Sequence, residues 1–438
     1  MLGIIGLILA IVFMIIGAYK GLGALPLTII SALIVAIFNQ INIWTALSEM
    51  YMSGYVGTYM SYFLILIFSA LYAKVMDQTG CATAIGYKFI DWFGTKNVIL
   101  VAILITSILT YGGVSLFVCI FAVGPILFVL FKEANLPRHL TIGCFVTGAA
   151  TYTMTCLPGT TQLTNVIPTQ YLGTKLTAAP VLGVLCAASI FIICFGYMQY
   201  AAKKAVKAKE SFSFPEGYDT THFEVDRSAL PAAAKAFLPM IVLVLFIIIG
   251  GRFISDSAML TVIAMLIGTV LCCILNLDKL KGVNIKKMIT SGLGDGISSI
   301  GGLAAVVAFG TVVSSSAAFQ QISDAVLNVN MSPYFKGIFA TAVISGVTGS
   351  SSGGVRILLA SMSDYFINSG CNLNILHRLM AISAGSLDSL PHASGLFIML
   401  AGLGLTHKEG YKHVFVTTVV APAVVAIVAA LICTVAGL

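Results

Sequence analysis

Long apolar runs follow one another from the first residues of the chain to the last. The first of them, LGIIGLILAIVFMIIGAY, begins at residue 2. About 20 consecutive apolar residues are enough to cross the hydrocarbon core of a bilayer as a helix. Only 9% of the 438 residues are charged, whereas a soluble domain carries about 25%. The sequence therefore predicts an all-α polytopic membrane protein whose outer surface faces the lipid bilayer.

The cysteines and the net charge point to no other class. The ten cysteines have no metal-ligand spacing and most lie in apolar segments, so we expect small buried hydrophobic residues and no cofactor or metal. The formal net charge of +7 comes from lysines between the apolar runs, so we expect no nucleic-acid partner. The first run has no basic segment before it and no cleavage site, which favours a retained span over a signal peptide.

A single long polar stretch, residues 201–235, divides the chain into two apolar halves. Three short patterns recur in the same order in both halves. The first half has YGGVS at 111, LPRHL at 136 and TCLPGTT at 155; the second has SSGGVR at 351, ILHRL at 375 and DSLPHAS at 388. Because three matches in one order indicate an internal duplication, we expect a first repeat at 1–200, a cytoplasmic linker at 201–235 and a second repeat at 236–438.

The lysines and arginines predict the orientation of the two repeats. If the N-terminus is outside and each half crosses the membrane an odd number of times, 18 of the 23 basic residues face the cytoplasm, 4 lie outside, and 1, Arg356, lies within the membrane. This bias agrees with the positive-inside rule. An odd number of crossings inverts the second repeat, as in many secondary transporters. Both termini are then outside the cytoplasm, in a bacterial plasma membrane. The basic residues expected outside are Lys175, Arg252, Lys336 and Arg378.

The apolar segments also give a map of the spans. In the first half we expect spans near 2–19, 22–38, 56–75 and 177–200, a re-entrant hairpin at 98–131 and a broken span at 139–170. In the second half we expect spans near 236–251, 257–275, 295–318 and 411–437, a hairpin at 334–368 and a broken span at 376–406. Segments 77–95 and 319–332 are too polar to span, so we expect them along the membrane interfaces.

Four polar breaks interrupt the apolar segments. Two are the hairpin tips at 110–115 and 348–356; two are unwound spans at 151–165 and 383–395, each with a proline that interrupts a helix. Backbone groups freed from helical pairing cost several kcal/mol in hydrocarbon, so we expect the breaks inside the protein, around a cavity near the midplane. Half-helices there would aim their N-terminal amides at an anion.

The ionisable side chains at these breaks are those of Arg356, Asp388 and His392. A charge this deep in a membrane is a candidate functional residue, and the planar fork of arginine matches a carboxylate. Two interpretations of Arg356 remain open: it binds a substrate carboxylate, or it pairs permanently with Asp388 or, less suitably placed, Asp364. Asp388 and His392 are the proton-coupling candidates, with a core histidine bonded to a carbonyl as the alternative for His392.

Other function classes have weaker support in the sequence. GSSSG at 349–353 fits the nucleophile-elbow pattern of hydrolases, but that motif needs a strand-turn-helix context. An intramembrane serine hydrolase using Ser351 and His392, and a passive carboxylate facilitator, therefore remain alternatives to a secondary transporter. No Walker A or HExxH motif is present, so an ion gradient or the substrate's own gradient must supply the energy.

The run YGGVSLFVCIFAVGPILFVLFKEANLPRHLTIG and the following TYTMTCLPGTTQLTNVIPTQYLGT resemble the gluconate permease family, and most closely its D-β-hydroxybutyrate permeases. The resemblance covers nearly the whole chain. It implies proton-coupled uptake of a small hydroxylated monocarboxylate by an elevator-like mechanism, in a homodimer with scaffold and transport domains. The chain has no Ser-Asn-Thr signature at either tip, which disfavours sodium coupling. The substrate-site residues implied by position are Gly112, Gly113, Ser115, Gly159, Thr160, Asn165, Ser351, Ser352, Gly353 and Gly354, with Asp388, Pro391 and His392.

Overall fold

The computed structural model describes residues 2–216, 227–251, 253, 254 and 256–437, and across these ranges the regular structure is entirely helical. Within these ranges, eight helices are long and apolar enough to cross a membrane. A ninth candidate is the bent pair Cys81–Phe93 and Thr95–Tyr111, whose two parts meet at 102°. The prediction of an all-α polytopic membrane protein is therefore confirmed.

The first half contains α1 to α11. The helices are α1 (Leu2–Tyr19), α2 (Ala24–Phe38), α3 (Ile43–Thr45) with a π-helical turn (Ala46–Tyr51), α4 (Met52–Gln78), α5 (Cys81–Phe93), α6 (Val98–Tyr111), α7 (Leu116–Glu133), α8 (His139–Ala149), α9 (Tyr152–Thr155), α10 (Leu163–Leu172) and α11 (Pro180–Lys207). A short 3-10 turn (Thr95–Asn97) precedes α6.

The second half begins after a 3-10 turn (Arg227–Ala229) and contains α12 to α21. The helices are α12 (Ala233–Gly250), α13 (Ser257–Leu275), α14 (Ile285–Ser314), α15 (Ala317–Leu327), α16 (Pro333–Thr348), α17 (Ser351–Asn368), α18 (Leu373–Leu387), α19 (Ser394–Gly402), α20 (His407–Val414), a π-helical turn (Phe415–Val420) and α21 (Ala421–Val435). Each half thus has a helix hairpin followed by a broken helix, α6–α10 in the first and α16–α19 in the second.

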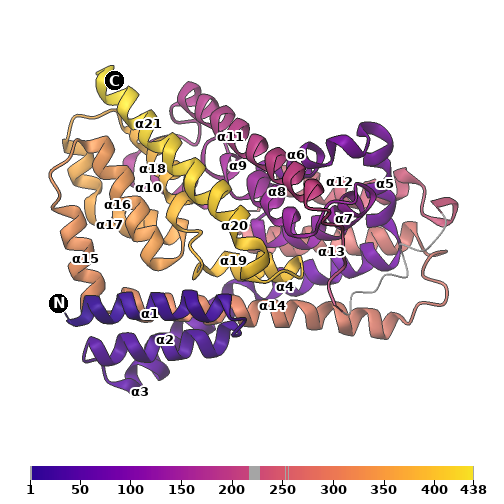
Figure 1. Ribbon diagram of the computed structural model, residues 1–438, viewed down its shortest axis with the longest axis horizontal. Helices are drawn as coiled ribbons and strands as arrows, with labels where there is room; N and C mark the ends of the chain where they lie inside the picture. Colours follow the sequence, from indigo (N-terminus) through magenta and orange to yellow (C-terminus); the bar gives the residue numbers. More distant parts are fainter. Residues whose placement is uncertain (1, 217–226, 252, 255, 438) are drawn as a thin grey trace.

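Helices that correspond in the two halves pack in reciprocal pairs. The counterparts α4 and α14 pack along each other, as do α11 and α21. Likewise α2 packs on α14 while α13 packs on α4, and α10 packs on α17 while α19 packs on α7. Figure 1 shows α10 among α16 to α18, and α12 and α13 beside α5 to α7, so each half reaches into the other. The two halves are therefore packed into each other and do not form separate bodies.

Glycines allow the long helices α4 and α14 to approach closely. A Cβ at Gly296 of α14 would lie 2.5 Å from the Cα of Ile67, and one at Gly54 would lie 2.9 Å from the Cα of Ala308. Small residues of this kind let backbones touch between membrane helices, where van der Waals packing replaces the hydrophobic effect. The pair α4–α14 consequently forms a close-packed axis joining the two halves.

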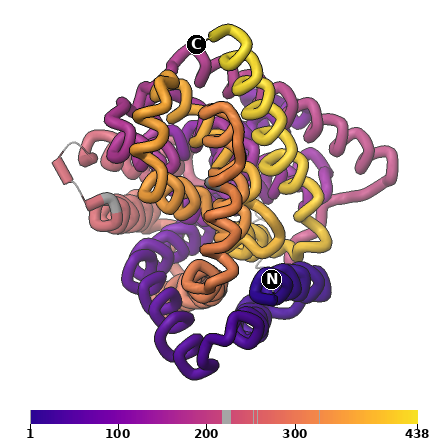
Figure 2. Tube along the Cα trace, turned by 90° about the vertical axis from the view of Figure 1, so that its left-hand side faces the viewer, coloured from indigo at the N-terminus to yellow at the C-terminus, as the bar shows by residue number. Residues whose placement is uncertain are grey.

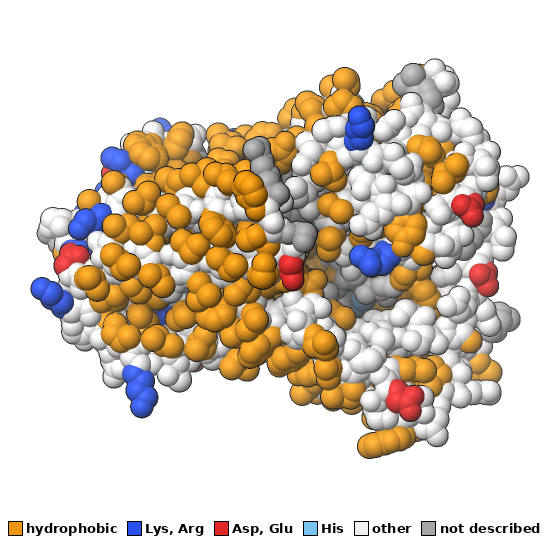
Figure 3. Space-filling view, turned by 180° about the vertical axis from the view of Figure 1, so that it is seen from behind, with side chains coloured by type: hydrophobic (Ala, Val, Ile, Leu, Met, Phe, Trp, Pro, Cys, Tyr) orange, Lys and Arg blue, Asp and Glu red, His pale blue; other side chains and the backbone are white. Residues whose placement is uncertain are grey.

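The outer surface is apolar, as expected for contact with lipid. Hydrophobic side chains cover the left-hand part of the face in Figure 3, where charged ones lie along the edge, while a few charged side chains are scattered over the right-hand part. Exposed isoleucines, leucines and valines recur along α1, α11, α12 and α21. In Figure 2 the C-terminal end of α21 lies far from α1 and α2.

The predicted span map agrees with these helices at most places. The structure extends the third span back to Ile43 and begins α14 at Ile285, ten residues before the predicted start at 295. The segments expected at the interfaces form the short helices α5 and α15. The prediction for Arg252 and part of the predicted linker, 217–226, lie outside the described residues.

Candidate substrate site

The second hairpin turns between α16 and α17 at Gly349 and Ser350. Gly349 has φ +63°, a left-handed conformation that favours glycine. The Ser350 hydroxyl then caps α17 by accepting from the Gly353 amide at 3.2 Å. A Cβ at Gly354 would lie 2.7 Å from the Cα of Ser345, so the glycine is required where the two arms of the hairpin touch. Gly354 therefore has a packing role in this structure.

The second unwound segment, Asp388 to Ala393, lies directly against this tip. His392 is 2% exposed, and its Nε2 donates to the carbonyl oxygen of Gly346 at 2.8 Å. A Cβ at Gly349 would lie 3.2 Å from the Cα of Ala393. His407, which the sequence did not single out, holds the same segment by donating from Nε2 to the Pro391 carbonyl at 3.0 Å. The two histidines thus fix the break by backbone hydrogen bonds.

Asp388 lies at the end of α18, and Ser389 donates to its Oδ1 at 2.9 Å. Ser351 of the hairpin tip lies near this carboxylate. His392 Nε2 is engaged with Gly346, and its Nδ1 has no partner in the described structure, so the Ser351–His392 pair that a hydrolase would need is not formed there.

Arg356 is exposed on α17 and forms no ion pair in the described part of the chain. The permanent pair with Asp388 or Asp364, one of the two interpretations of Arg356, is therefore absent. Asp364 lies two turns further along the same exposed stripe of α17, too distant for a helical i,i+4 contact. The guanidinium remains unneutralised at the start of a helix that begins at the hairpin tip.

The first hairpin tip and the first unwound segment are joined in the same way, through two side chains that sequence reasoning missed. The Tyr111 hydroxyl donates to the Pro158 carbonyl at 3.1 Å, and Gln162 Nε2 donates to the carbonyls of Thr110 at 3.1 Å and Val114 at 3.4 Å. Gly113 has φ +97° and Gly159 has φ +83°, conformations that favour glycine. Each tip therefore lies on the break of its own half.

Two predicted substrate-site hydroxyls are buried and have no partner. Ser115 Oγ, at the start of α7, and Thr160 Oγ1, in the first break, are inaccessible to solvent and form no hydrogen bond in the described structure. An unsatisfied buried hydroxyl costs about 1–3 kcal/mol. Such groups commonly mark places where a ligand or ordered water completes the bonding.

Asn165, another predicted substrate-site residue, forms all its hydrogen bonds within the protein. It is fully buried, its Nδ2 donates to the carbonyls of Thr160 at 2.7 Å and Leu176 at 2.9 Å, and its Oδ1 accepts from His377 Nε2 at 2.9 Å. The Thr174 hydroxyl bonds to the other ring nitrogen of His377 at 2.7 Å. Both amide hydrogens are thus used inside the protein, so Asn165 shapes the break.

Arg378, which was expected on the outer side of the membrane, is buried within the protein. It is 0% exposed and donates to the carbonyls of Thr155 at 3.1 Å, Leu176 at 3.3 Å and Ala178 at 2.9 Å. Lys336, also expected outside, is 8% exposed and lies over the Tyr365 ring at 4.4 Å. A loop carbonyl cluster and an aromatic ring solvate these cations in place of water, which charge counting along a sequence cannot detect.

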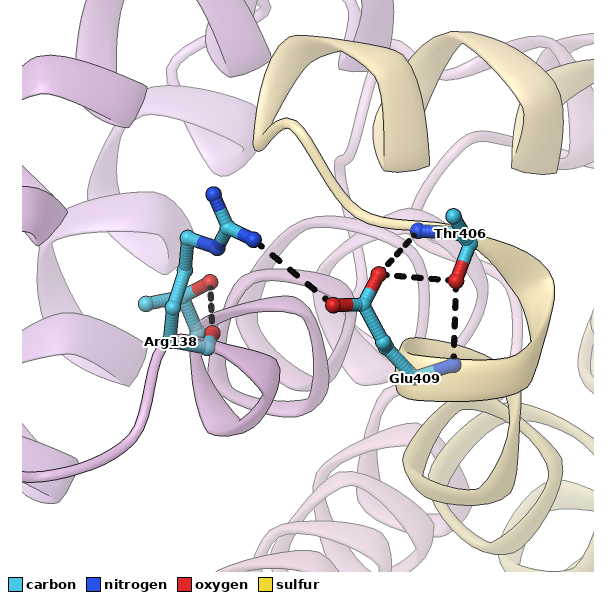
Figure 4. A network of polar contacts seen from close by, with 4 residues as sticks. Arg138, Thr406 and Glu409 are labelled. Atoms are coloured by element: carbon cyan, nitrogen blue, oxygen red, sulfur yellow. Dashed lines mark hydrogen bonds and ion pairs between the residues drawn. The ribbon is translucent and has the colours of Figure 1, made fainter. Parts of the chain in front are cut away.

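The corresponding positions of the first half make a similar cross-connection. Arg138 and His139 lie in LPRHL, where the second half has His377 and Arg378 in ILHRL. Arg138 Nη2 lies 3.7 Å from Glu409 Oε1, while Glu409 Oε2 accepts from the amide of Thr406 at 2.8 Å (Figure 4). The start of each broken helix therefore holds the segment that follows the break in the other half.

Four helices have their N-termini at these tips and breaks. α7 and α10 start after the first tip and first break, and α17 and α19 start after the second pair. The start of α7 touches the start of α19, since a Cβ at Gly395 would lie 3.7 Å from Leu116 Cδ2. The end of α18 touches α9, where a Cβ at Gly385 would lie 2.8 Å from Thr155 Cγ2. Free N-terminal amides with partial positive charge can bind an anion without a metal or cofactor.

The hairpins, the broken helices and the apolar exterior define a multi-pass membrane permease. The sequence profile described as GntP family permease matches residues 1–436. The chain is also 30% identical to the "Uncharacterized transporter YxjC" of Bacillus subtilis (strain 168), over 96% of each chain. The protein belongs to the GntP permease family, as the sequence resemblance indicated, and is a membrane transporter.

Proposed function

We propose that this permease takes up a small hydroxylated monocarboxylate by proton symport. The family name and the resemblance to D-β-hydroxybutyrate permeases suggest gluconate, 3-hydroxybutyrate or a similar hydroxy acid as the substrate. The observation that carries the proposal is the meeting of two hairpin tips with two broken helices, where four helix N-termini begin.

Each part of such a substrate has a matching group at this site. A carboxylate is suited to the N-terminal amides of α7 and α17 and to the unpaired guanidinium of Arg356. The unpartnered hydroxyls of Ser115 and Thr160 suit a substrate hydroxyl, which can both donate and accept. Ser352, Gly112 and Gly353 line the half-exposed parts of the same tips.

Asp388 is the proposed proton carrier. A monocarboxylate is an anion at neutral pH, and an inside-negative potential opposes its entry by about 2.3 kcal/mol per 100 mV. One proton makes the movement electroneutral. Asp388 lies at the break, near Ser351 of the tip, so a ligand at the tip would change the surroundings of the carboxylate directly. Substrate and proton would then strengthen each other's binding by the same factor.

Transport itself is proposed to follow an elevator-like alternating-access cycle in a homodimer. The two reciprocal sets of hairpin and broken helix would form the moving part. The close-packed pair α4–α14 would belong to the scaffold.

Uptake by purified protein in proteoliposomes tests the proposal. With an inward proton gradient and no sodium, we expect labelled 3-hydroxybutyrate or gluconate to accumulate above equilibrium, and unlabelled substrate inside to drive counterflow. Equilibration without accumulation or counterflow would indicate a passive facilitator. Accumulation that requires sodium would overturn proton coupling.

A further inference from the structure

A basic groove lies beside the C-terminal end of α11, away from the tips and breaks. Its volume is about 720 Å³. Four of the lining residues are lysines: Lys96, Lys203, Lys204 and Lys207. The apolar part of the lining includes Ile99, Leu136, Tyr200 and Val206. We propose that this groove binds an anionic phospholipid, with the phosphate among the lysines and the acyl chains along α11.

Among the described residues, no acidic side chain neutralises the charge of the groove. The lining contains no aspartate or glutamate, and none of the four lysines forms an ion pair within the described chain. The acids nearest in sequence are engaged elsewhere: Glu133 bonds to Arg227 at 3.1 Å and Glu210 to His139 at 2.7 Å. A phosphate would therefore meet uncompensated positive charge.

The position of the groove along α11 suits a lipid headgroup. At 1.5 Å per residue, roughly 20 residues of α11 from Pro180 cross a hydrocarbon core of about 30 Å. The end of the core then falls near Tyr200, which is 63% exposed. Lys203, Lys204 and Lys207 come next, at headgroup depth. Trp92 is also exposed, close in sequence to Thr95 and Lys96 of the groove, and interfacial aromatic residues are typical of this level.

The acyl chains have a continuous apolar path below the lysines. Exposed side chains follow one side of α11 through Val184, Leu185 and Ile192 to Tyr200 at the groove. A free phosphate would use only the lysines, whereas a phospholipid would use both the lysines and this path. Basic pockets between membrane helices are known to bind anionic headgroups. The combination therefore favours a lipid over a soluble anion.

The test measures thermal unfolding and bound lipid on the full chain in detergent, so it is independent of transport. Cardiolipin and phosphatidylglycerol should raise the midpoint of the wild-type protein by several degrees, and phosphatidylcholine or millimolar inorganic phosphate should not. The variant K203Q/K204Q/K207Q should lose most of this shift and at least tenfold in lipid affinity. The matched control K281Q/K408Q/K412Q removes three exposed lysines elsewhere and should respond as the wild type does.

A second variant separates the groove from general attraction at a basic helix end. Ala134→Trp fills the groove but leaves every lysine, and it should also lose bound cardiolipin in native mass spectrometry. Retention of lipid by A134W, an equal loss in the control triple variant, or stabilisation by inorganic phosphate would each overturn the proposal. If A134W or the triple variant at the groove lost a dimer but kept its lipid, the proposal would also be overturned, because the groove would then be a protein interface.

Discussion

At the scale of single residues, Arg356 can now be tested as a carboxylate ligand, because the structure gives it no ion-pair partner among the described residues. Arg356→Lys keeps the charge but loses the planar fork. If the arginine holds a substrate carboxylate by two hydrogen bonds, we expect the apparent KM to rise about tenfold, corresponding to about 1.4 kcal/mol. Expression and thermal midpoint should change little. An unchanged KM would make the residue peripheral.

Asp388 supplies a second residue-scale prediction, on coupling. Asp388→Asn keeps the size of the side chain and its ability to accept from Ser389, but it cannot carry a proton. We expect accumulation driven by a pH gradient to be abolished while counterflow of labelled substrate continues. Ser389→Ala serves as a control that removes one hydrogen bond and leaves the carboxylate. Undiminished accumulation in D388N would exclude Asp388 as the proton carrier.

The sequence could identify Asp388 and His392 as residues at a break, because a proline and polar residues interrupt an apolar run. It could not predict their partners. His392 donates to the Gly346 carbonyl, and Asn165 forms hydrogen bonds with His377 and with two backbone carbonyls. The Asn165–His377 bond joins residues 212 positions apart, one in each half, and the His392–Gly346 bond joins residues 46 positions apart. Tertiary packing decides these two bonds, and for Asn165 and His377 it is the packing of one half against the other.

At the scale of elements, the second hairpin offers a matched pair of glycines. A Cβ at Gly354 would meet the backbone of Ser345 at 2.7 Å, whereas one at Gly353 would approach only the side chain of Ser350, with Oγ at 3.1 Å and Cβ at 3.2 Å. We expect Gly354→Ala to lower the thermal midpoint strongly, with a loss of about 1–3 kcal/mol typical of overpacking. Gly353→Ala should remain close to wild type in stability. Equal thermal midpoints for the two variants would show that α16 and α17 can move apart at Gly354 without loss of stability.

The segment that begins α20 is stabilised by its own cap more than by its ion pair. Thr406 and Glu409 form a capping box, and loss of such a cap costs about 1 kcal/mol. The Arg138–Glu409 contact is 3.7 Å long and Glu409 is 44% exposed, so solvent screening leaves it little net value. We expect Thr406→Ala to lower the thermal midpoint more than Arg138→Gln does. The opposite order would make the ion pair the main connection between α8 and α20.

Secondary structure was the most predictable level, because long apolar runs and proline breaks locate spans and interruptions directly. The sequence does not predict the direction of the 102° bend between α5 and the helix that follows it. The early start of α14 was also missed, since the polar segment at its beginning, with Lys286 and Lys287, does not look like a span. A helix that extends beyond the bilayer needs no apolar residues there, so hydrophobicity does not reveal where such a helix begins.

At the scale of the whole molecule, the two halves of the chain are packed into each other, with α2 on α14 and α13 on α4. The duplication that three short patterns in the same order indicate stays a prediction. What the sequence could not give is which surfaces the two halves share. The close approach at Gly54 and Gly296 depends on glycines that look like any others in an apolar run.

The last prediction concerns orientation, which rests on the distribution of basic residues. Burial of Arg378 and Lys336 leaves Lys175 as the exposed basic residue expected outside among those described. The predicted excess of basic loop residues on the cytoplasmic side becomes larger, because a cation buried within the protein does not count as a loop charge. The linker, with α11 ending in Lys203, Lys204 and Lys207, is therefore expected in the cytoplasm and both termini outside it.

Accessibility of introduced cysteines checks this orientation. Of the ten native cysteines, only Cys273 and Cys371 are partly exposed, so both are first replaced by serine. A membrane-impermeant maleimide added to intact cells should then label Lys175→Cys and fail to label Glu216→Cys, in the linker. Permeabilising the cells should make Glu216→Cys reactive, which shows that the thiol itself is accessible. Ready labelling of Glu216→Cys in intact cells would invert the topology, because the basic end of α11 would then face outward against the positive-inside bias.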